Sequence, residues 1–463
     1  MIPMIVAAAF FMEQLDSTII TTAVPAIARS LRVTPVQMSL AVAAYVLAVA
    51  VFIPVSGWFA DRFGARRIFV LALAVFTLAS ALCGIAQNFA MLVAMRILQG
   101  LGGAMMTPVG RLILLRSFPR SELMTAMTWV TLPAIMGPVI GPLLGGVLTT
   151  YLSWRWIFYV NLPFGLIGML LAWRFVENVR DAEVAGFDFP GFLMLGGGLG
   201  LFQFGMENVS RPVISVPTIV VTLVASIALL AGFWHYAQRR PAPAVDLGLF
   251  RMRSFRIGTL AGGLCRIGMN GVPFLLPLML QVGFGLSPVA SGSITFIGSA
   301  GAVMIRTLIA PVLRRHGFRT VLIGSAVAGS VALAGFSLLG PHTPHWVLLL
   351  YVFLFGLTRS TQFMTSNTLA YSDMPDSHLS RATSLGGALQ QLSVSFGVSA
   401  SAVLLSIVSL HSHVLAPARF HEAFLLLAAI PLLAVPGFAA LRPQDGAKVT
   451  GRRQAIVEME GRD

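Results

Sequence analysis

The chain of 463 residues is strongly apolar, since 57% of its residues are hydrophobic, 10% are charged and the mean hydropathy is +0.85. A soluble domain carries about 25% charged residues, so this composition excludes a water-soluble globular protein of this length. The formal net charge of +14 could indicate nucleic-acid binding, but the arginines stand mostly in short clusters between long apolar blocks. The composition therefore predicts an all-α polytopic membrane protein that has the lipid bilayer, and no nucleic acid, as its partner.

A membrane-spanning helix needs about 20 apolar residues. The first apolar block has no basic leading region and contains Glu13 and Asp16, so we interpret it as a retained span rather than a signal peptide. Its abrupt start at Met1 leads us to expect that a few leader residues are missing. Charged or Pro/Gly-rich turns delimit fourteen predicted spans, which are 4–27, 38–60, 68–87, 91–115, 123–149, 154–176, 187–206, 214–236, 257–281, 288–312, 319–340, 345–367, 382–409 and 421–441.

The distribution of basic residues predicts the orientation of these spans. An even number of spans places both termini on one side of the membrane. With both termini in the cytoplasm, the inside loops and the tail hold twenty Lys and Arg residues and the outside loops hold five. This agrees with the positive-inside rule. The two cysteines, Cys83 and Cys265, both lie inside apolar segments, so we expect no disulfide framework.

Two short loops form a faint internal repeat. The stretch from Gly57 to Arg67 follows the second span and the stretch from Ala310 to Arg319 follows the tenth, and each combines a glycine with flanking arginines. Such a repeat is typical of transporters built from two parallel halves. The predicted organisation is a six-helix bundle at 1–180, two inserted helices and a loop at 181–249, a second six-helix bundle at 250–442 and a cytoplasmic tail at 443–463.

Several stretches resemble the major facilitator superfamily, in its fourteen-span drug:proton antiporter branch (EmrB/QacA-like). They are Leu15–Pro25, Gly57–Arg67, Arg96–Gly103, Gly137–Gly146 and Ser153–Pro163. Within the branch the chain looks most similar to the MdtD-type transporters, through Arg266-Ile-Gly-Met and Ser366-Asn367-Thr-Leu. The resemblance implies a major facilitator fold in a bacterial inner membrane. It also implies a monomeric antiporter that exports small organic solutes or drugs by alternating access, with the proton gradient as its energy source and no cofactor.

The first span carries the candidate proton carrier. Asp16 is expected in mid-span, where a charge is unfavourable by several kcal/mol unless it is paired or faces water. Removal from water favours a protonated carboxyl, which is what proton coupling needs. Glu13 falls on nearly the same helical face, and Arg96 in the fourth span is a natural partner for a membrane acid. The resemblance links this arginine to proton transfer, whereas a permanent structural ion pair is the alternative.

Two further motifs have candidate roles in the transport cycle. The loop that contains Asp61 is either a solvated turn or, as the resemblance implies, a charge latch that stabilises the outward-facing state; its members are Gly57, Asp61, Arg62, Gly64, Arg66 and Arg67. The counterpart loop has Arg314 in place of Asp61, so the latch is expected on one side only. The fifth span combines proline, which bends helices, with glycine, which permits close contact. We predict an antiporter hinge or, alternatively, a plain kink, at Gly137, Pro138, Gly141, Pro142, Gly145 and Gly146.

Six arginines are expected to be embedded in the spans, against only two acids that are clearly buried, Asp16 and Glu13. They are Arg96, Arg111, Arg174, Arg266, Arg306 and Arg359. The excess positive charge predicts a cavity that accepts an anionic or zwitterionic solute, with Arg266 as its contact; a guanidinium bound to helix carbonyls is the alternative. Export or import of organic anions or metabolites is accordingly an alternative to drug export. Further candidates for the cavity are Gln99, Asn270, Gln362 and Gln390.

Signatures of other functions are missing from the sequence. It contains neither HExxH nor GxSxG, and no GxxxxGK[ST] phosphate-binding loop. Five histidines in expected outside loops have no acidic or cysteine partners nearby, so no metal site is predicted. The sequence therefore favours a transporter over an enzyme.

Overall fold

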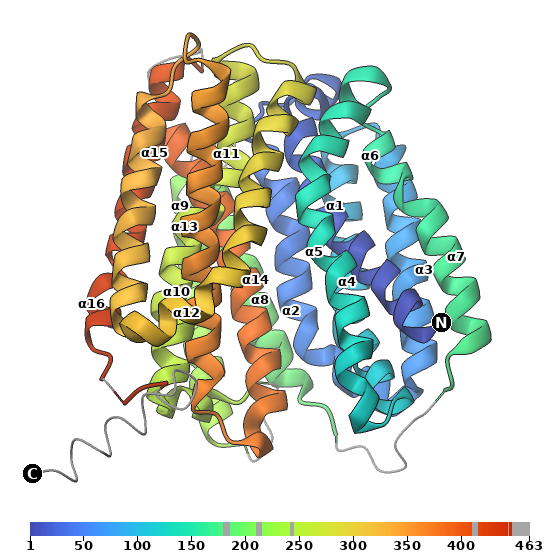
Figure 1. The fold of residues 1–463 in the computed structure, drawn as a ribbon. Helices are drawn as coiled ribbons and strands as arrows, with labels where there is room; N and C mark the ends of the chain where they lie inside the picture. The colour runs from blue at the N-terminus through green and yellow to red at the C-terminus, as the bar shows by residue number, and fades with distance from the viewer. Residues whose placement is uncertain (179–185, 210–214, 241–244, 410–414, 443, 447–463) are drawn as a thin grey trace, which may run out of the picture. The chain divides into compact units, whose positions relative to one another are not determined.

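The computed structural model describes residues 1–178, 186–209, 215–240, 245–409, 415–442 and 444–446. Nearly all of the predicted tail at 443–463 lies outside these residues. Fourteen helices among them are long and apolar enough to cross a membrane, which confirms the predicted number of spans. The described residues form helices joined by short turns, without a β-strand (Figure 1).

The helices α1 to α9 cover the first eight spans. Their bounds are α1 (Ile2–Leu31), α2 (Ser39–Phe63), α3 (Ala65–Gly84), α4 (Phe89–Ser117), α5 (Arg120–Tyr151), α6 (Trp156–Tyr159), α7 (Asn161–Phe175), α8 (Phe189–Asn208) and α9 (Val216–Gln238). The short α6 and α7 together make the sixth span.

The remaining elements form six spans. They are the 3₁₀ turn η1 (Leu247–Arg251), α10 (Arg253–Asn270), α11 (Val272–Leu278), the π-helical turn η2 (Met279–Gly283), α12 (Pro288–Gly335), the 3₁₀ turn η3 (Phe336–Leu338), α13 (His345–Ser372), α14 (Asp376–Val408), α15 (Pro417–Leu432) and α16 (Val435–Ala439). The long α12 is interrupted at Gly317, which has a φ of 76°. Gly64, the matching glycine of the repeat, has a φ of 97° between α2 and α3. Both repeated loops therefore use glycine because its backbone adopts positive φ without strain.

Contacts divide the chain into two compact units. Unit 1 consists of Met1–Ala244 and Leu276–Phe296, and unit 2 consists of Val245–Leu275 and Ile297–Asp463. The inserted helices α8 and α9 thus belong to unit 1. The short segment at 276–296 also packs with unit 1, although it follows α10 of unit 2 along the chain.

Small residues bring the helices of unit 1 close together. A Cβ atom on Gly102 of α4 would lie 2.7 Å from the backbone nitrogen of Phe76 in α3. A Cβ atom on Gly100 would meet the backbone carbonyl of Tyr45 in α2. Because only glycine permits such close approach, α4 packs directly on both neighbours. This contact sets the position of Arg96, one turn earlier on α4.

The inserted hairpin is attached to α2 near both of its ends. At one end Trp58 of α2 packs against Phe187 and Phe189 at ring-centroid distances of 5.3 and 6.4 Å. At the other end the Ser39 hydroxyl donates a hydrogen bond of 2.7 Å to the carboxylate of Glu207 on α8. Aromatic and polar contacts therefore both fix α8 on unit 1.

Unit 2 is organised around α10, which packs on α13, α14 and α15. A Cβ atom on Gly258 would lie 2.8 Å from the backbone of Ala370 in α13, and one on Gly268 would lie 2.6 Å from Pro431 in α15. The buried apolar core beside α10 includes Cys265, Leu322 and Leu369. This packing buries one polar face of α10 between α13 and α14.

Candidate functional site

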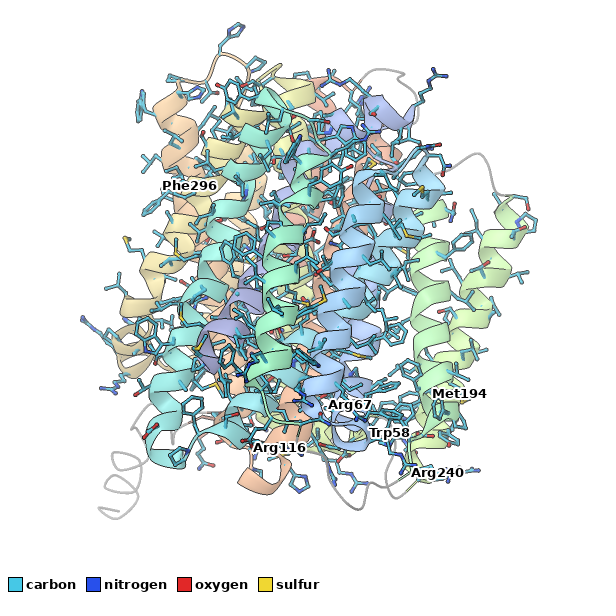
Figure 2. All side chains as sticks on the ribbon, turned by 90° about the vertical axis from the view of Figure 1, so that its right-hand side faces the viewer. Trp58, Arg67, Arg116, Met194, Arg240 and Phe296 are labelled. Carbon is cyan, nitrogen blue, oxygen red and sulfur yellow. The ribbon has the colours of Figure 1, made fainter. Side chains whose placement is uncertain are left out.

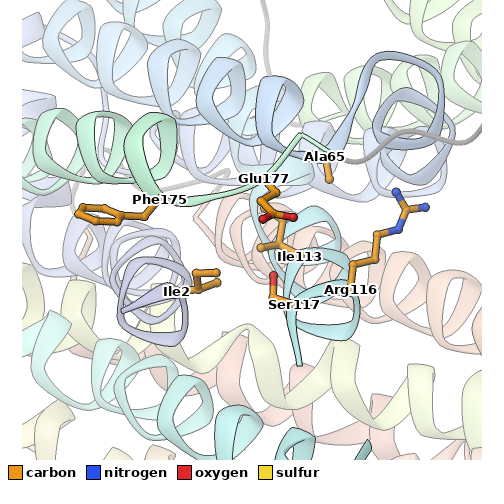
Figure 3. A pocket seen from close by; sticks show the side chains of 7 residues that line it. All are labelled: Ile2, Ala65, Ile113, Arg116, Ser117, Phe175 and Glu177. Atoms are coloured by element: carbon orange, nitrogen blue, oxygen red, sulfur yellow. The ribbon is translucent and has the colours of Figure 1, made fainter. Parts of the chain in front are cut away.

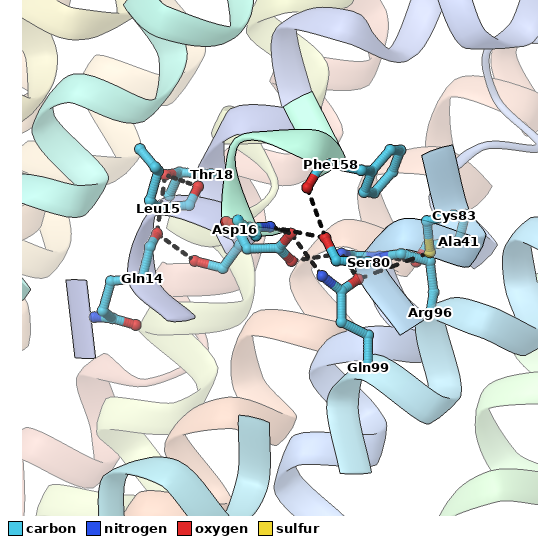
Figure 4. Close-up of polar contacts among 12 residues, drawn as sticks. Gln14, Leu15, Asp16, Thr18, Ala41, Ser80, Cys83, Arg96, Gln99 and Phe158 are labelled. Atoms are coloured by element: carbon cyan, nitrogen blue, oxygen red, sulfur yellow. Dashed lines mark hydrogen bonds and ion pairs between the residues drawn. The ribbon is translucent and has the colours of Figure 1, made fainter. Parts of the chain in front are cut away.

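The carboxylate of Asp16 lies at the centre of a buried polar network in unit 1 (Figure 4). Its Oδ2 accepts a hydrogen bond of 2.6 Å from Nη1 of Arg96, and the two side chains form an ion pair that is completely shielded from solvent. Its Oδ1 accepts bonds of 2.8 Å from the amides of Gln99 and Asn161. Both oxygens of the carboxylate are therefore satisfied, as a charge in this position requires.

Arg96 is held on several sides. Its Nη1 also donates to Oε1 of Gln99 at 2.7 Å, and its Nε donates to the carbonyl of Ala41 at 3.4 Å. Its guanidinium carbon lies 4.1 Å from the ring centroid of Tyr45. Nη2 has no hydrogen-bond partner among the described residues. The charge of Arg96 is thus balanced by Asp16, with one donor left over.

Asn161 and Ser80 are members of this network that sequence reasoning missed. The Asn161 amide donates both to Asp16 and, at 3.0 Å, to the hydroxyl of Ser80, which donates in turn to the carbonyl of Phe158 at 2.9 Å. Asn161 belongs to the quoted Ser153–Pro163 stretch, so the motif contained the signal. Its partner Ser80 stands in an apolar stretch of α3, where only the fold reveals its role.

Glu13 has a separate environment on the same side of α1. Its carboxylate is buried and accepts a hydrogen bond of 2.6 Å from the hydroxyl of Thr107 on α4. The structure therefore places both predicted carboxyl groups on the contact between α1 and α4, about one helical turn apart. Asp16 pairs with an arginine there, whereas Glu13 pairs with a hydroxyl group.

The predicted latch residues lie at one end of unit 1. Asp61 forms an ion pair of 3.0 Å with Arg116 at the end of α4, a partner that the loop sequence did not identify. Figure 2 shows Arg116, Arg67 and Trp58 at the same end of the helices. The backbone nitrogen of Arg67 donates to Oδ1 of Asn178 at 3.3 Å, and a Cβ atom on Gly64 would clash with that side chain.

Other members of the loop make weaker contacts or none. Arg66 donates to the carbonyl of Val176 at 3.4 Å, and Arg62 is exposed. No atom lies within 4 Å of a Cβ built on Gly57. Within the predicted latch, Asp61 and Arg116 therefore form the ion pair seen among the described residues.

A small pocket of about 210 Å³ lies beside this latch (Figure 3). The starts of α1 and α3, the ends of α4 and α7 and the residue Glu177 form its walls. Its lining residues are Ile2, Ala65, Ile113, Arg116, Ser117, Phe175 and Glu177. Arg116 belongs to both the pocket and the latch, so the pocket opens next to the ion pair.

The predicted hinge motif forms the contact between α5 and α1. Three glycines of the motif pack against α1. Cβ atoms built on Gly137, Gly141 and Gly145 would contact Leu15, Thr18 and Ile19, in that order. The helix continues through its three prolines from Arg120 to Tyr151. The glycine face of α5 therefore supports the part of α1 that carries Asp16.

Gly146, the last residue of the motif, packs against a different segment. A Cβ atom on Gly146 would lie 2.9 Å from Val289, and one on Gly292 would meet the carbonyl of Pro142. Both contacts lie within unit 1, because the segment 276–296 belongs to it. The motif thus contacts α1 with one face and the start of α12 with the other.

Arg266 is the buried cation of unit 2. It is 4% exposed, donates to Oδ1 of Asn367 at 2.7 Å and lies 4.7 Å from the ring centroid of Phe363. Neither its Nε nor the side-chain nitrogen of Asn270, one turn later, has a hydrogen-bond partner among the described residues. The guanidinium is thus held by the side chain of Asn367, and it donates to no helix carbonyl among the described residues.

The other cavity candidates are placed differently. Gln99 belongs to the Asp16 network of unit 1. Gln362 is buried against Ser325 and Ser366, to which it is hydrogen-bonded. Gln390 is half-buried on α14.

The charge count made from the sequence needs two corrections. Only Arg96 and Arg266 of the six span arginines are buried; Arg359 is half-buried, and the exposed ones are Arg111, Arg174 and Arg306. Glu207 on α8 is a third buried acid, 5% exposed, and it accepts bonds from Ser39 and Gln203. It was missed because the predicted span ended one residue before it.

Comparison with known proteins agrees with this architecture. The model of the Major Facilitator Superfamily matches residues 6–398 and, in a second match, 258–457. The chain is 38% identical to a protein of Serratia proteamaculans named "Putative multidrug resistance protein MdtD", over 93% of this chain and 91% of that protein. A protein of the same name from Klebsiella pneumoniae is 38% identical, over 97% and 96% of the two chains.

Solved structures share the fold at much lower identity. A peptide transporter POT, in complex with sulfate, has a TM-score of 0.69 at 14% identity, over 96% of this chain and 95% of that one. A point mutant of the nucleoside transporter NupG has a TM-score of 0.64 at 15% identity, over 95% and 99%. At this identity the likeness shows the fold alone.

Proposed function

The chain belongs to the major facilitator superfamily and is a membrane transporter, not an enzyme, and on this premise we propose that it is a proton-coupled efflux antiporter. It exports small organic solutes or drugs by alternating access, and the proton gradient supplies the energy without a cofactor. The single observation that carries the proposal is the completely buried carboxylate of Asp16, paired with Arg96.

Protonation of Asp16 would change the contact between α1 and α4. The ionised carboxylate attracts the Arg96 guanidinium at 2.6 Å, and both side chains are completely shielded from solvent. A neutral carboxyl would leave Arg96 as an uncompensated buried charge, which is unfavourable by several kcal/mol unless the helices move or water enters. Binding and release of a proton thus shift the balance between two helix arrangements, which is the coupling that an antiporter needs.

Glu13 is the second proton-carrying candidate. It lies on the same contact between α1 and α4, and its partner Thr107 carries no charge. A protonated Glu13 can keep a hydrogen bond to Thr107, because a hydroxyl group both donates and accepts. The two carboxyl groups therefore respond differently to protonation, and only Asp16 releases a buried cation when it becomes neutral.

The latch and the α5 glycines complete the proposed cycle. The pair of Asp61 and Arg116 joins the ends of α2 and α4, so its opening would free one end of unit 1. Close packing of Gly141 and Gly145 on α1 would transmit a bend of α5 to the segment that follows Asp16. In this proposal the latch holds one state and the α5 contact acts as the hinge.

The names of the relatives support a proposal for the setting and the substrate. Proteins with 38% identity are named as multidrug resistance proteins of bacteria. We therefore propose the bacterial inner membrane, with both termini in the cytoplasm and the monomer as the functional unit. Organic anions are a second candidate substrate class, favoured by the buried Arg266 that has no carboxylate partner among the described residues.

The test uses purified protein in proteoliposomes with an imposed pH gradient and a panel of radiolabelled organic cations and anions. Any transported solute should move faster with the gradient than without it, and Asp16→Asn should abolish this acceleration. The matched control is Glu422→Gln, which removes a carboxylate whose side chain is 46% exposed and paired with Arg419. Transport that ignores the gradient, or an Asp16→Asn variant that still responds to it, would contradict proton coupling.

A further inference from the structure

The polar face of α10 carries a buried positive charge deep in the membrane. Arg266 follows Ile257, the first residue of the apolar span, by nine positions, which corresponds to about 14 Å along the helix. This is close to half of the roughly 30 Å hydrocarbon core. The side chain is 4% exposed, so it does not extend out to the membrane surface.

No acidic residue in the described part of unit 2 forms an ion pair with Arg266. Among its described spans the only acidic residue is Glu422, near the start of α15, and that residue is bound to Arg419. Among the described residues, Arg266 contacts the neutral amide oxygen of Asn367 and the ring of Phe363. A buried guanidinium with neutral neighbours leaves an uncompensated charge, which is strongly unfavourable in a low dielectric.

Two unused donors lie together on this face. Nε of Arg266 has no hydrogen-bond partner among the described residues, and the same holds for Nδ2 of Asn270. The two residues are four positions apart and therefore neighbours on one helical face, about 6 Å apart at Cβ. Asn270 is 5% exposed and packs closely on α14. A Cβ atom built on Gly397 of α14 would lie 3.0 Å from the Cβ of Asn270.

The hydrogen-bond donors of Arg266 and Asn270 favour an anion as the ligand. A guanidinium presents its donors in a planar fork that matches a carboxylate, and an amide nitrogen donates one more bond. The contact of Nη2 with Asn367 fixes the rotation of the fork. We propose that this face of α10, made by Arg266 and Asn270 and positioned by Asn367, binds the carboxylate group of a small organic anion.

The depth of the site identifies the source of the carboxylate. Phospholipid headgroups lie at the membrane surface, well away from the middle of a span. The ligand is therefore a solute that enters the transporter. The inference rests on the proposed function only in taking the chain to be a transporter, and it does not require proton coupling.

The first experiment compares three ligands of one shape on the wild-type protein. Full-length protein in nanodiscs is incubated with radiolabelled benzoate, and unlabelled benzoate, benzamide and benzylamine compete for it. We expect benzoate to compete and the neutral amide and the cation to fail, because only the carboxylate pairs with the guanidinium. Equal competition by benzamide, or no saturable binding of benzoate, overturns the proposal.

The second experiment assigns the binding to these residues. Arg266→Gln should weaken benzoate binding roughly 30-fold or more, as loss of a buried charge partner does. Asn270→Ala should weaken it about fivefold, by one hydrogen bond. The matched control is Arg174→Gln, an exposed arginine on α7 of unit 1, which should leave the affinity unchanged. Unchanged binding in Arg266→Gln overturns the assignment.

Folding is monitored by size-exclusion chromatography and thermal unfolding of each variant. If Arg266→Gln does not fold, benzoate binding by Arg266→Lys and Asn270→Ala is measured instead. Lysine keeps the positive charge but lacks the planar fork of hydrogen-bond donors. The outcome is separable from that of the proposed function. A pH-driven transporter that does not bind benzoate would refute only the carboxylate site, and a benzoate-binding protein that ignores the gradient would refute only proton coupling.

Discussion

The two units treat buried positive charge in opposite ways. In unit 1 the guanidinium of Arg96 is neutralised within the chain by Asp16, and amides on α4 and α7 satisfy the remaining oxygen. In unit 2 the guanidinium of Arg266 meets an amide oxygen and a phenyl ring. Since a buried charge needs a counter-charge, the first arginine can serve an internal proton equilibrium and the second can serve a ligand from outside.

The most direct test of this comparison is to replace each of the two arginines in turn. Arg96→Leu leaves the Asp16 carboxylate buried and unpaired, and we expect it to lower the free energy of unfolding by about 3–5 kcal/mol. Arg266→Leu breaks no ion pair, and the hydrogen bond that it loses is offset by removal of an uncompensated buried charge, so we expect no loss of stability or a gain. Unfolding in mixed detergent micelles, followed by circular dichroism, measures both. Equal losses in the two variants would contradict the comparison.

The next largest effects on stability should come from the glycines that pack against the helices carrying Asp16 and Arg266. Gly141→Ala would push a methyl group against Thr18 of α1, and Gly397→Ala would place one 2.7 Å from the carbonyl of Ile267 in α10. We expect each to lower the free energy of unfolding by about 1–3 kcal/mol through overpacking. Gly141→Ala should also slow pH-driven efflux, whereas Gly397→Ala should also weaken benzoate binding.

Gly200→Ala is the control for these two variants, because a Cβ on that helical residue of α8 meets nothing within 4 Å. We expect it to be neutral or to stabilise the protein by about 0.5–1 kcal/mol. Destabilisation of all three variants to the same extent would show that the close contacts have no special role.

A smaller effect on stability is expected when Glu207, another buried acid of unit 1, is replaced. Glu207→Gln keeps an oxygen that can accept the hydrogen bond from Ser39, so we expect a change of about 1 kcal/mol or less in stability. The response of efflux to the pH gradient should persist in this variant and be lost in Asp16→Asn. Loss of the response in both variants, measured in the same proteoliposomes, would extend proton coupling to α8.

The smallest stability effect is expected at the latch. The side chains of Asp61 and Arg116 are 34% and 21% exposed, and a partly exposed pair contributes about 0–1 kcal/mol. Asp61→Asn should therefore change the unfolding free energy little, and 1 M salt, with a Debye length of about 3 Å, should abolish even that difference. The buried Asp16 pair should be insensitive to salt. Unfolding at low and high salt checks both statements.

Sequence reasoning predicted much of the fold and part of the site. The number of spans and the family could be read directly, because apolar blocks of membrane length and ordered motifs are properties of the linear chain. Asp16 and Arg96 were selected for the same reason, since a charge inside an apolar block stands out. Ser80 could not be selected, because hydroxyl groups are common in spans and only its neighbours give it a role.

The burial of individual charges required the tertiary structure. Arg266, Arg306 and Arg359 look alike in the sequence, yet they are buried, exposed and half-buried. Position along a span gives the depth in the membrane but not the direction in which a side chain points. Helix packing sets that direction, and it also brought Arg116, rather than a neighbour in the loop, to Asp61.

The order of amino acids alone thus established that this chain crosses a membrane many times, carries ionisable groups within its spans and belongs with transporters. Those facts depend on composition and spacing, which folding does not alter. The three-dimensional arrangement decided which buried charges are neutralised by another described residue and which are not. Charge balance depends on distances of a few ångströms between residues that are far apart in the chain, as for Asp16 and Arg96, and such distances exist only once the helices have packed.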